Sequence, residues 1–162
     1  MAGTHITITL DDENLRRQLG DLIGALTHPE PALRSIGEEL QRTTQERFDP
    51  GQKRAPDGTP WARNSPVTIA RKGRDNPLYQ RGNLQNTIRY QLRGATGVEV
   101  GTNLVYGAAQ QFGMVKGYAG RTRRGAPIPW GNIPARPYLG LSADDETEVV
   151  RILRDYLERQ TG

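Results

Sequence analysis

"TIRYQLRGATGVEVGTN", residues 87–103, decides the fold of this chain. Its first part, TIRYQL, alternates polar and apolar side chains and places Ile88, Tyr90 and Leu92 on one face, as in a half-buried strand. GATG is a tight connection, and VEVGTN, residues 98–103, alternates again. The stretch therefore predicts an antiparallel hairpin with one buried face.

Helical patterns flank this hairpin on both sides. HITITL (5–10) has the alternation of a further strand, and apolar side chains then recur with a helical period over 11–27 and 31–48. The inward face of the second helix carries Leu33, Ile36, Leu40, Thr44 and Phe48. A last helix over 143–160 begins after Ser142, which can cap it, and has carboxylates in its first turn. The expected fold is α+β, a small antiparallel sheet flanked by two N-terminal helices and a C-terminal helix, with long extended loops, in a single domain of 162 residues.

Long segments without a regular pattern separate these elements. Residues 49–78 contain five prolines, so we expect a long loop there. Trp61 follows a turn in this loop, where it either pins the loop onto the core or anchors a partner. Residues 114–127 are rich in glycine, and we expect both loops to be mobile in the free chain. Residues 128–141 hold three prolines, which predict a stiff extended arm.

Charge is segregated along the chain, although the net charge is only +4. Residues 1–46 and 142–162 carry net charges of −4 and −3, whereas residues 47–141 carry +11. This asymmetry favours an acidic or polyanionic partner for the middle region, or acidic helices packed beside a basic sheet of the same or a neighbouring copy. Cations concentrate in one loop, which could contact phosphate or an acidic neighbour through Lys116, Arg121, Arg123 and Arg124.

The sequence offers no pattern of a catalytic, metal or cofactor site. It has no cysteine, and His5 and His28 have no ligand spacing to each other or to a pair of carboxylates. Phosphate-binding glycine loops and nucleophile motifs are absent from it. No apolar run approaches the ~18 residues of a membrane span, and the N-terminus is too short and polar for a secretory signal. We therefore expect no catalytic residues, no cofactor, no metal and no membrane.

Four segments, in their order along the chain, resemble the phage virion morphogenesis family. They are ERFDPGQKRAPDGTPWA, LYQRGNLQNTIRYQL, VEVGTNLVYGAAQQFG and IPARPYLGLSADDE, and with the last helix they span about residues 46–160. This family groups tail-completion proteins of Mu-like and related tailed phages. Gly107 stands where alanine is usual, and Gln110 stands where histidine is common. The missing histidine removes any argument for proton or metal chemistry at that position.

The resemblance implies a non-enzymatic structural protein that completes the tail and enables head–tail joining, assembled as a ring that is often a hexamer. Expected partners are further copies of the chain, the tail tube and head or neck connector proteins. The expected location is the tail or neck of the virion, after assembly in the cytoplasm of the host bacterium. Ring subunits need arms that reach a neighbour, and a stiff arm loses less entropy on docking. The expected interface residues are Trp61, Phe112, Trp130, Arg136 and Tyr138.

Other interpretations stay open. Tyr138 and Leu139 can instead pack on the last helix of their own subunit. The basic middle region can form a nonspecific nucleic-acid-binding module in which residues 114–127 contact DNA phosphates. That module lacks interleaved stacking aromatics. An enzyme is the third class, for which the sequence supplies no nucleophile, base or cofactor loop.

Overall fold

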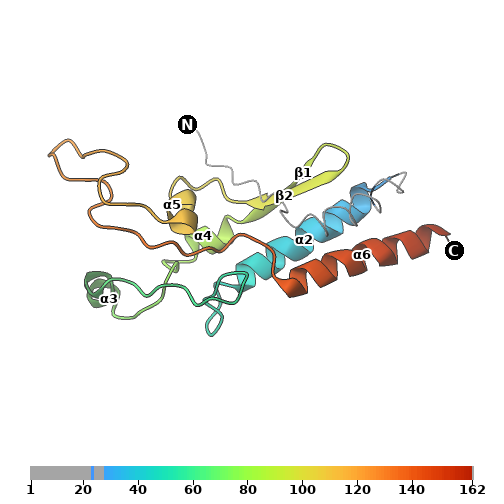
Figure 1. Ribbon diagram of the computed structural model, residues 1–162, viewed down its shortest axis with the longest axis horizontal. Coiled ribbons are helices and arrows are strands. Elements are labelled where there is room, and N and C mark those ends of the chain that lie inside the picture. Colours follow the sequence, from blue (N-terminus) through green and yellow to red (C-terminus); the bar gives the residue numbers. More distant parts are fainter. Residues whose placement is uncertain (1–22, 24–27, 162) are drawn as a thin grey trace.

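The structure, a computed structural model, describes Ile23 and residues 28–161. Its elements in chain order are α2 (Glu30–Glu46), α3 (Pro66–Lys72), α4 (Asn83–Asn86), β1 (Arg89–Arg93), β2 (Gly97–Gly101), α5 (Gly107–Phe112) and α6 (Ala143–Thr161). The fold is α+β, as predicted, and α2 packs against both the β1–β2 hairpin and α6 (Figure 1). The predicted strand over 5–10 and helix over 11–27 lie outside the described residues, apart from Ile23.

Strands β1 and β2 form the predicted antiparallel hairpin, with five residues in each strand paired in register. Tyr90 of β1 lies over Gly37 in the middle of α2. A Cβ atom added to Gly37 would stand only 2.3 Å from the Tyr90 ring. Glycine inside a helix costs about 1 kcal/mol relative to alanine. The close approach of the ring explains why a glycine occupies this helical position.

Two apolar clusters make up the core. The first joins the loop after α2, the hairpin and the chain before α6 through Phe48, Trp61, Leu84, Ile88, Val100, Tyr138 and Leu139. The rings of Trp61 and Tyr138 meet Phe48 edge to face, with centroids 5.1 and 5.6 Å apart. The second cluster joins α2 to α6 through Ala32, Ile36, Val149 and Leu153. Tyr138 thus packs within its own chain, but on aromatic neighbours instead of on the last helix.

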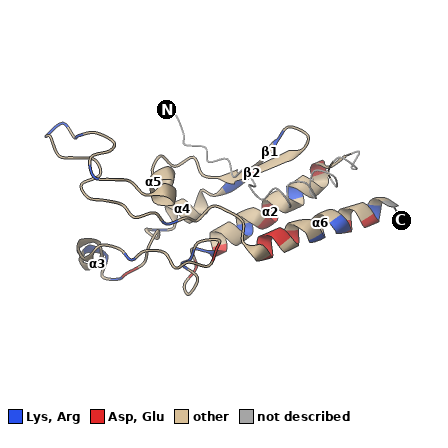
Figure 2. Ribbon diagram, viewed as in Figure 1, with Lys and Arg blue, Asp and Glu red and all other residues tan. Residues whose placement is uncertain are grey.

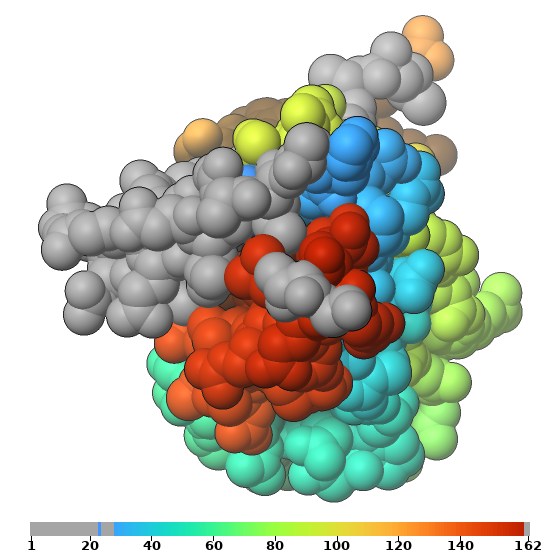
Figure 3. Space-filling view, turned by 90° about the vertical axis from the view of Figure 1, so that its right-hand side faces the viewer, coloured from blue at the N-terminus to red at the C-terminus, as the bar shows by residue number. Residues whose placement is uncertain are grey.

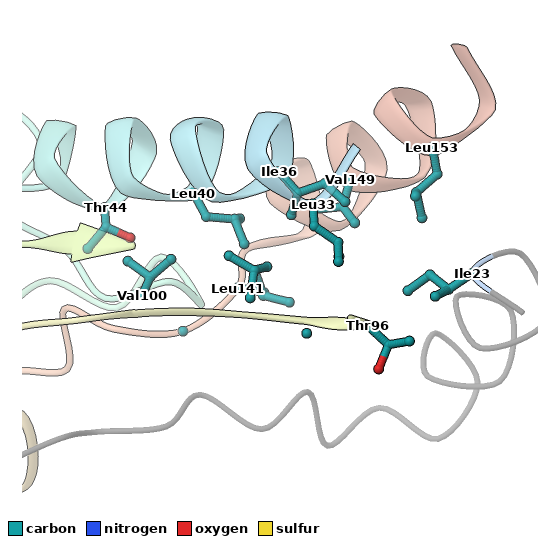
Figure 4. A pocket seen from close by; sticks show the side chains of 13 residues that line it. Ile23, Leu33, Ile36, Leu40, Thr44, Thr96, Val100, Leu141, Val149 and Leu153 are labelled. Atoms are coloured by element: carbon teal, nitrogen blue, oxygen red, sulfur yellow. The ribbon is translucent and has the colours of Figure 1, made fainter. Parts of the chain in front are cut away.

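An apolar cavity of about 160 Å³ lies where α2, α6 and β2 meet (Figure 4). Its described lining is mostly aliphatic and includes Leu33, Ile36, Leu40, Val100, Leu141 and Leu153. The polar side chains in that lining are Thr44 and Thr96, and none of the described lining residues ionises. The cavity belongs to the core, and its described lining supplies no acid, base or metal ligand.

Helix α3 lies inside residues 49–78, where the sequence predicts irregular structure, so that prediction is wrong for this part of the loop. Ser65 caps the helix, because its Oγ accepts a hydrogen bond from the backbone N–H of Thr68. Pro66 occupies the first helical position, where a missing N–H is tolerated. Gly73 ends the helix in the left-handed region, with φ of 71°. The proline that argued against regular structure is here a helix-starting residue.

Helix α6 begins as predicted from its sequence. The Ser142 Oγ accepts a hydrogen bond from the Asp145 N–H at 3.1 Å, and the Ser142 N–H donates to Asp145 Oδ2 at 2.8 Å. This reciprocal pair is a capping box, which satisfies backbone donors that have no partner inside the helix. Figure 3 shows α6 beside α2 on the face formed by one end of the molecule.

Candidate functional site

Residues 114–133 form a two-legged projection from the body, which we call the hairpin arm (Figure 1). At its root, Met114 and Ile133 exchange two backbone hydrogen bonds, of 2.9 and 2.7 Å. Further backbone hydrogen bonds join the two legs as far as Thr122 and Ala126. The arm therefore has a defined, internally hydrogen-bonded shape.

The sequence did not predict this pairing. It suggested a separate loop over 114–127 and an extended arm over 128–141, but the structure joins the first of these to the start of the second. Glycines in the first leg, and prolines and a glycine in the second, break the alternation of side chains that marks a strand. Turn residues at the tip do not form a recognisable two-residue hairpin motif either. The pairing is consequently visible only in three dimensions.

Four cations lie on the hairpin arm and none of its residues is acidic. Lys116 lies near the root, whereas Arg121, Arg123 and Arg124 lie near the tip, and all four side chains are exposed. Figure 2 shows this concentration of basic residues at the tip. Arg121 donates to the Gly125 carbonyl at 2.8 Å. Within the described part of the chain, none of the four forms an ion pair with a carboxylate.

Large apolar side chains are exposed on and around the arm. Among the described residues they are Val67, Val105, Tyr106, Phe112, Val115, Tyr118, Ile128 and Trp130. All but Val67 fall within residues 105–130, and none of those listed belongs to α2, α6 or the β1–β2 hairpin. A groove between α5 and the arm root is lined in part by Phe112, Val115 and Tyr118. Contiguous exposed apolar surface of this kind marks a site of protein contact.

The chain after the arm, residues 134–141, is held to the body by side chains from elsewhere, and we call it the clamped segment. Gln111 of α5 accepts hydrogen bonds from the backbone N–H groups of Tyr138 and Leu139, at 2.9 and 3.0 Å. Its amide also donates to the Leu139 carbonyl at 3.0 Å. The Trp61 indole donates to the Pro137 carbonyl at 2.7 Å. Trp61 therefore pins its own loop to the clamped segment.

Arg136 is the cation that the clamped segment itself contributes. Its backbone N–H donates to the Gln110 carbonyl at 2.7 Å. Its guanidinium donates to the carbonyl oxygens of Ala62 and Arg63 at 2.7 and 2.8 Å. Burial lowers the pKa of Arg136 from its ordinary value. This side chain ties the arm root to residues 49–78.

A buried ion pair completes the clamp. Arg47, just after α2, donates to the carbonyls of Tyr138 and Gly140 at 2.8 and 3.0 Å and pairs with Asp145 at 2.5 Å. Burial lowers the pKa of Arg47, and the charge of Asp145 opposes that shift. One side chain therefore joins the end of α2, the clamped segment and the cap of α6.

The predicted interface residues fall into two groups. Trp61, Arg136 and Tyr138 are buried in their own chain, with 6%, 6% and 0% of their surface exposed. Trp130 and Phe112 are 77% and 68% exposed. A partner could reach the first group only if the core opened. The surface that remains available for contact is formed by Trp130, Phe112 and their exposed neighbours.

Sequence reasoning missed three residues of the clamp, namely Arg47, Gln111 and Asp145. The spacing of Ser142 and Asp145 is that of a capping box, so a signal for Asp145 was present. Nothing local to Arg47 or Gln111 indicates a partner about 90 or 28 positions away. Such contacts depend on the tertiary fold alone.

Comparison with known proteins places the chain. Residues 10–158 match the phage virion morphogenesis family. The chain belongs to this family. It is 31% identical over 146 residues to a Haemophilus influenzae protein described as Mu-like prophage FluMu G protein 2, and the match covers 90% of this chain and 91% of that relative. No solved structure matches it. The resemblance seen in the sequence is confirmed, and this virion morphogenesis protein has a role in building a phage particle.

The structure accounts for one departure of this virion morphogenesis protein from the pattern of its family. A Cβ atom at Gly107 would lie 2.7 Å from Thr102 Cγ2 and 2.9 Å from the Tyr138 hydroxyl. That hydroxyl has no hydrogen-bond partner among the described residues, and burial raises the pKa of Tyr138. The space that an alanine methyl would need is therefore filled by the side chains of Thr102 and Tyr138.

The described residues form no metal site and no membrane-spanning helix. Within residues 28–161 and Ile23, no group of three or more histidine, aspartate or glutamate side chains could hold a metal ion. No helix in the same part of the chain combines the length and the apolar character that crossing a membrane requires.

Proposed function

We propose that this protein completes the phage tail and enables the tail to join the head, acting as a non-enzymatic ring of about six copies. One observation carries the proposal: backbone hydrogen bonds join the two legs of the hairpin arm, yet the arm exposes Trp130, Tyr118 and Val115. Each large apolar side chain gains roughly 1.5–3 kcal/mol when it is covered. In a chain that functioned alone, these side chains would stay exposed to water and this stabilisation would not be realised.

The clamp supports the same proposal. Binding costs less when a segment is already ordered in its bound shape. Here the arm is internally hydrogen-bonded, and its continuation is fixed to the body by Arg47, Trp61, Gln111 and Arg136. The arm is therefore preorganised to reach a neighbour in the ring. Further partners in this proposal are the tail tube and head or neck connector proteins, in the tail or neck of a virion assembled in the bacterial cytoplasm.

An assembly experiment tests this function. The gene is inactivated in an inducible phage, and the protein is supplied from a plasmid as wild type, as Tyr118→Ala/Trp130→Ala or as the control Val67→Ala, which alters an equally exposed side chain on α3. Electron microscopy then counts joined particles, free heads and free tails. We expect free heads and tails without the protein, rescue by wild type and by the control, and no rescue by the double variant. Normal numbers of joined particles without the protein would refute the proposal.

Nonspecific DNA binding is a second candidate function, and it is favoured by the four cations of the arm, which form no ion pair with any carboxylate that the structure describes. A phosphate contact of this kind releases counterions, so the logarithm of the binding constant should fall linearly with the logarithm of the salt concentration. Fluorescence anisotropy with a labelled duplex measures that slope. A flat response, or no binding at low salt, would eliminate this candidate.

A further inference from the structure

The molecule carries an acidic surface as well as a basic one, and the two lie on different elements. Arg42 of α2 bridges Glu39 and Glu46, and Arg151 of α6 bridges Glu148 and Asp155. The two groups are neighbours, because the charge of Arg42 acts on Glu148 and that of Glu39 acts on Arg151. Asp144 lies one helical turn before Glu148 on the same face of α6. We call this surface the acidic seam, and its members are Glu39, Arg42, Glu46, Asp144, Glu148, Arg151 and Asp155.

The acidic seam has more carboxylates than its own arginines neutralise. Its five carboxylates face two arginines, so it carries an excess of three negative charges. The hairpin arm carries four positive charges and no negative one. The excess on each surface is thus similar in size and opposite in sign. Electrostatic complementarity of this kind fixes the register of an interface and accelerates encounter.

The two surfaces of one molecule do not meet each other. In Figure 2 the arm tip and the start of α6 lie well apart, with the body of the molecule between them. Among the described residues, no carboxylate pairs with the charges of the arm, so these charges can meet a second molecule. Figure 3, which views the right-hand end of Figure 1, shows α6 beside α2 at the end away from the arm.

We propose that the hairpin arm of one copy binds the acidic seam of a second copy. This inference rests on the proposed function, because it assumes that copies of the chain associate. An interface between two different surfaces is heterologous, and repetition of such a contact closes a ring when the rotation between copies allows it. The seam then gives each arm one defined place on its neighbour. DNA could bind the arm through its phosphates, but DNA binding would give the acidic seam no function.

A charge-exchange experiment tests this pairing. One variant reverses the arm (Arg121→Glu/Arg123→Glu/Arg124→Glu), and another reverses the seam (Glu46→Lys/Glu148→Lys/Asp155→Lys). A control reverses three exposed arginines outside both surfaces (Arg54→Glu/Arg71→Glu/Arg89→Glu). Circular dichroism and thermal unfolding first establish that each is folded. A milder seam variant, Glu46→Gln/Glu148→Gln/Asp155→Asn, replaces the reversed one if that variant does not fold.

Light scattering over a concentration series then measures association at low salt. We expect wild type and the control to associate, each reversed variant alone to associate at least about tenfold more weakly, and an equimolar mixture of the two reversed variants to recover mixed complexes. With the milder seam variant, the expected result is a weakening intermediate between wild type and full reversal.

Several results would overturn the pairing. They are normal association of either reversed variant, no recovery in the mixture, a wild type that stays monomeric at every concentration, or loss of duplex DNA binding by the arm variant with association unchanged. None of these results decides the tail-completion role, which the phage assembly experiment tests separately. Joined particles that depend on the protein, together with a failed charge exchange, would retain the function and discard this interface.

Discussion

Removal of the Asp145 carboxylate should destabilise this protein more than any change at a neighbouring acidic residue. The side chains of Arg47 and Asp145 are 10% and 2% exposed, so truncation leaves a guanidinium buried without its counter-charge. Breaking a buried pair in this way typically costs about 3–5 kcal/mol. The same change removes half of the capping box, which is worth about 1 kcal/mol by itself. Because the two losses share one carboxylate, we expect about 4 kcal/mol in total for Asp145→Ala.

The assay is urea unfolding followed by circular dichroism, with the free energy of unfolding extrapolated to water. Asp144→Ala is the matched control, because Asp144 is exposed in the same helical turn and should cost only about 0.5 kcal/mol through the helix dipole. For a chain of this size, the expected loss corresponds to a decrease in Tm of roughly 10 °C.

A double variant separates the ion pair from other effects. Arg47→Leu/Asp145→Ala removes both charges, so its loss should be smaller than the sum of the two single losses, by at least about 1.5 kcal/mol. Equal stability of Asp145→Ala and Asp144→Ala would refute the reasoning. Strict additivity of the two single changes would show that the pair contributes no coupling.

Three further changes have defined expectations. Gly107→Ala should lower the free energy of unfolding by about 1–3 kcal/mol through overpacking. Adding Tyr138→Phe to that variant should restore part of the lost stability, which urea unfolding of the single and double variants measures. A double variant no more stable than Gly107→Ala would contradict the contact with the Tyr138 hydroxyl. Gln111→Ala should cost about 2–3 kcal/mol, because the N–H groups of Tyr138 and Leu139 lose their acceptor, and an unchanged midpoint would contradict it. Trp130→Ala should change the free energy of unfolding by less than about 0.5 kcal/mol and should reduce association measured by light scattering. A large loss of stability would show that Trp130 packs within its own chain.

The parts of the fold that local chemistry specifies could be predicted from the sequence. The β1–β2 hairpin follows from alternation around a short glycine-containing turn, and α6 follows from its cap and its apolar face. The inward residues of α2 follow from helical spacing alone. In each case the residues that decide the structure are within a few positions of one another.

The parts that failed depend on distant partners or on ambiguous residues. Pro66 can either break a helix or start one, and only the flanking Ser65 and Gly73 distinguish the two. Arg136 and Tyr138 are residue types that are common in protein interfaces. The same residue types also occupy buried positions within a chain, so residue type alone does not distinguish the two roles. Tyr138 is held in the core by Arg47 and Gln111, and no local pattern reveals these contacts.

The clamp also has a mechanical consequence. A hairpin held only at its ends would swing about its root, but here the chain leaves the arm through Pro134 and Pro137, whose φ angles are fixed. Hydrogen bonds from the side chains of Arg47, Trp61, Gln111 and Arg136 then hold this segment to the body. The segment runs straight into the cap of α6, which Arg47 ties to α2. A force on the arm would therefore reach both α2 and α6 through the clamped segment and the Arg47–Asp145 pair.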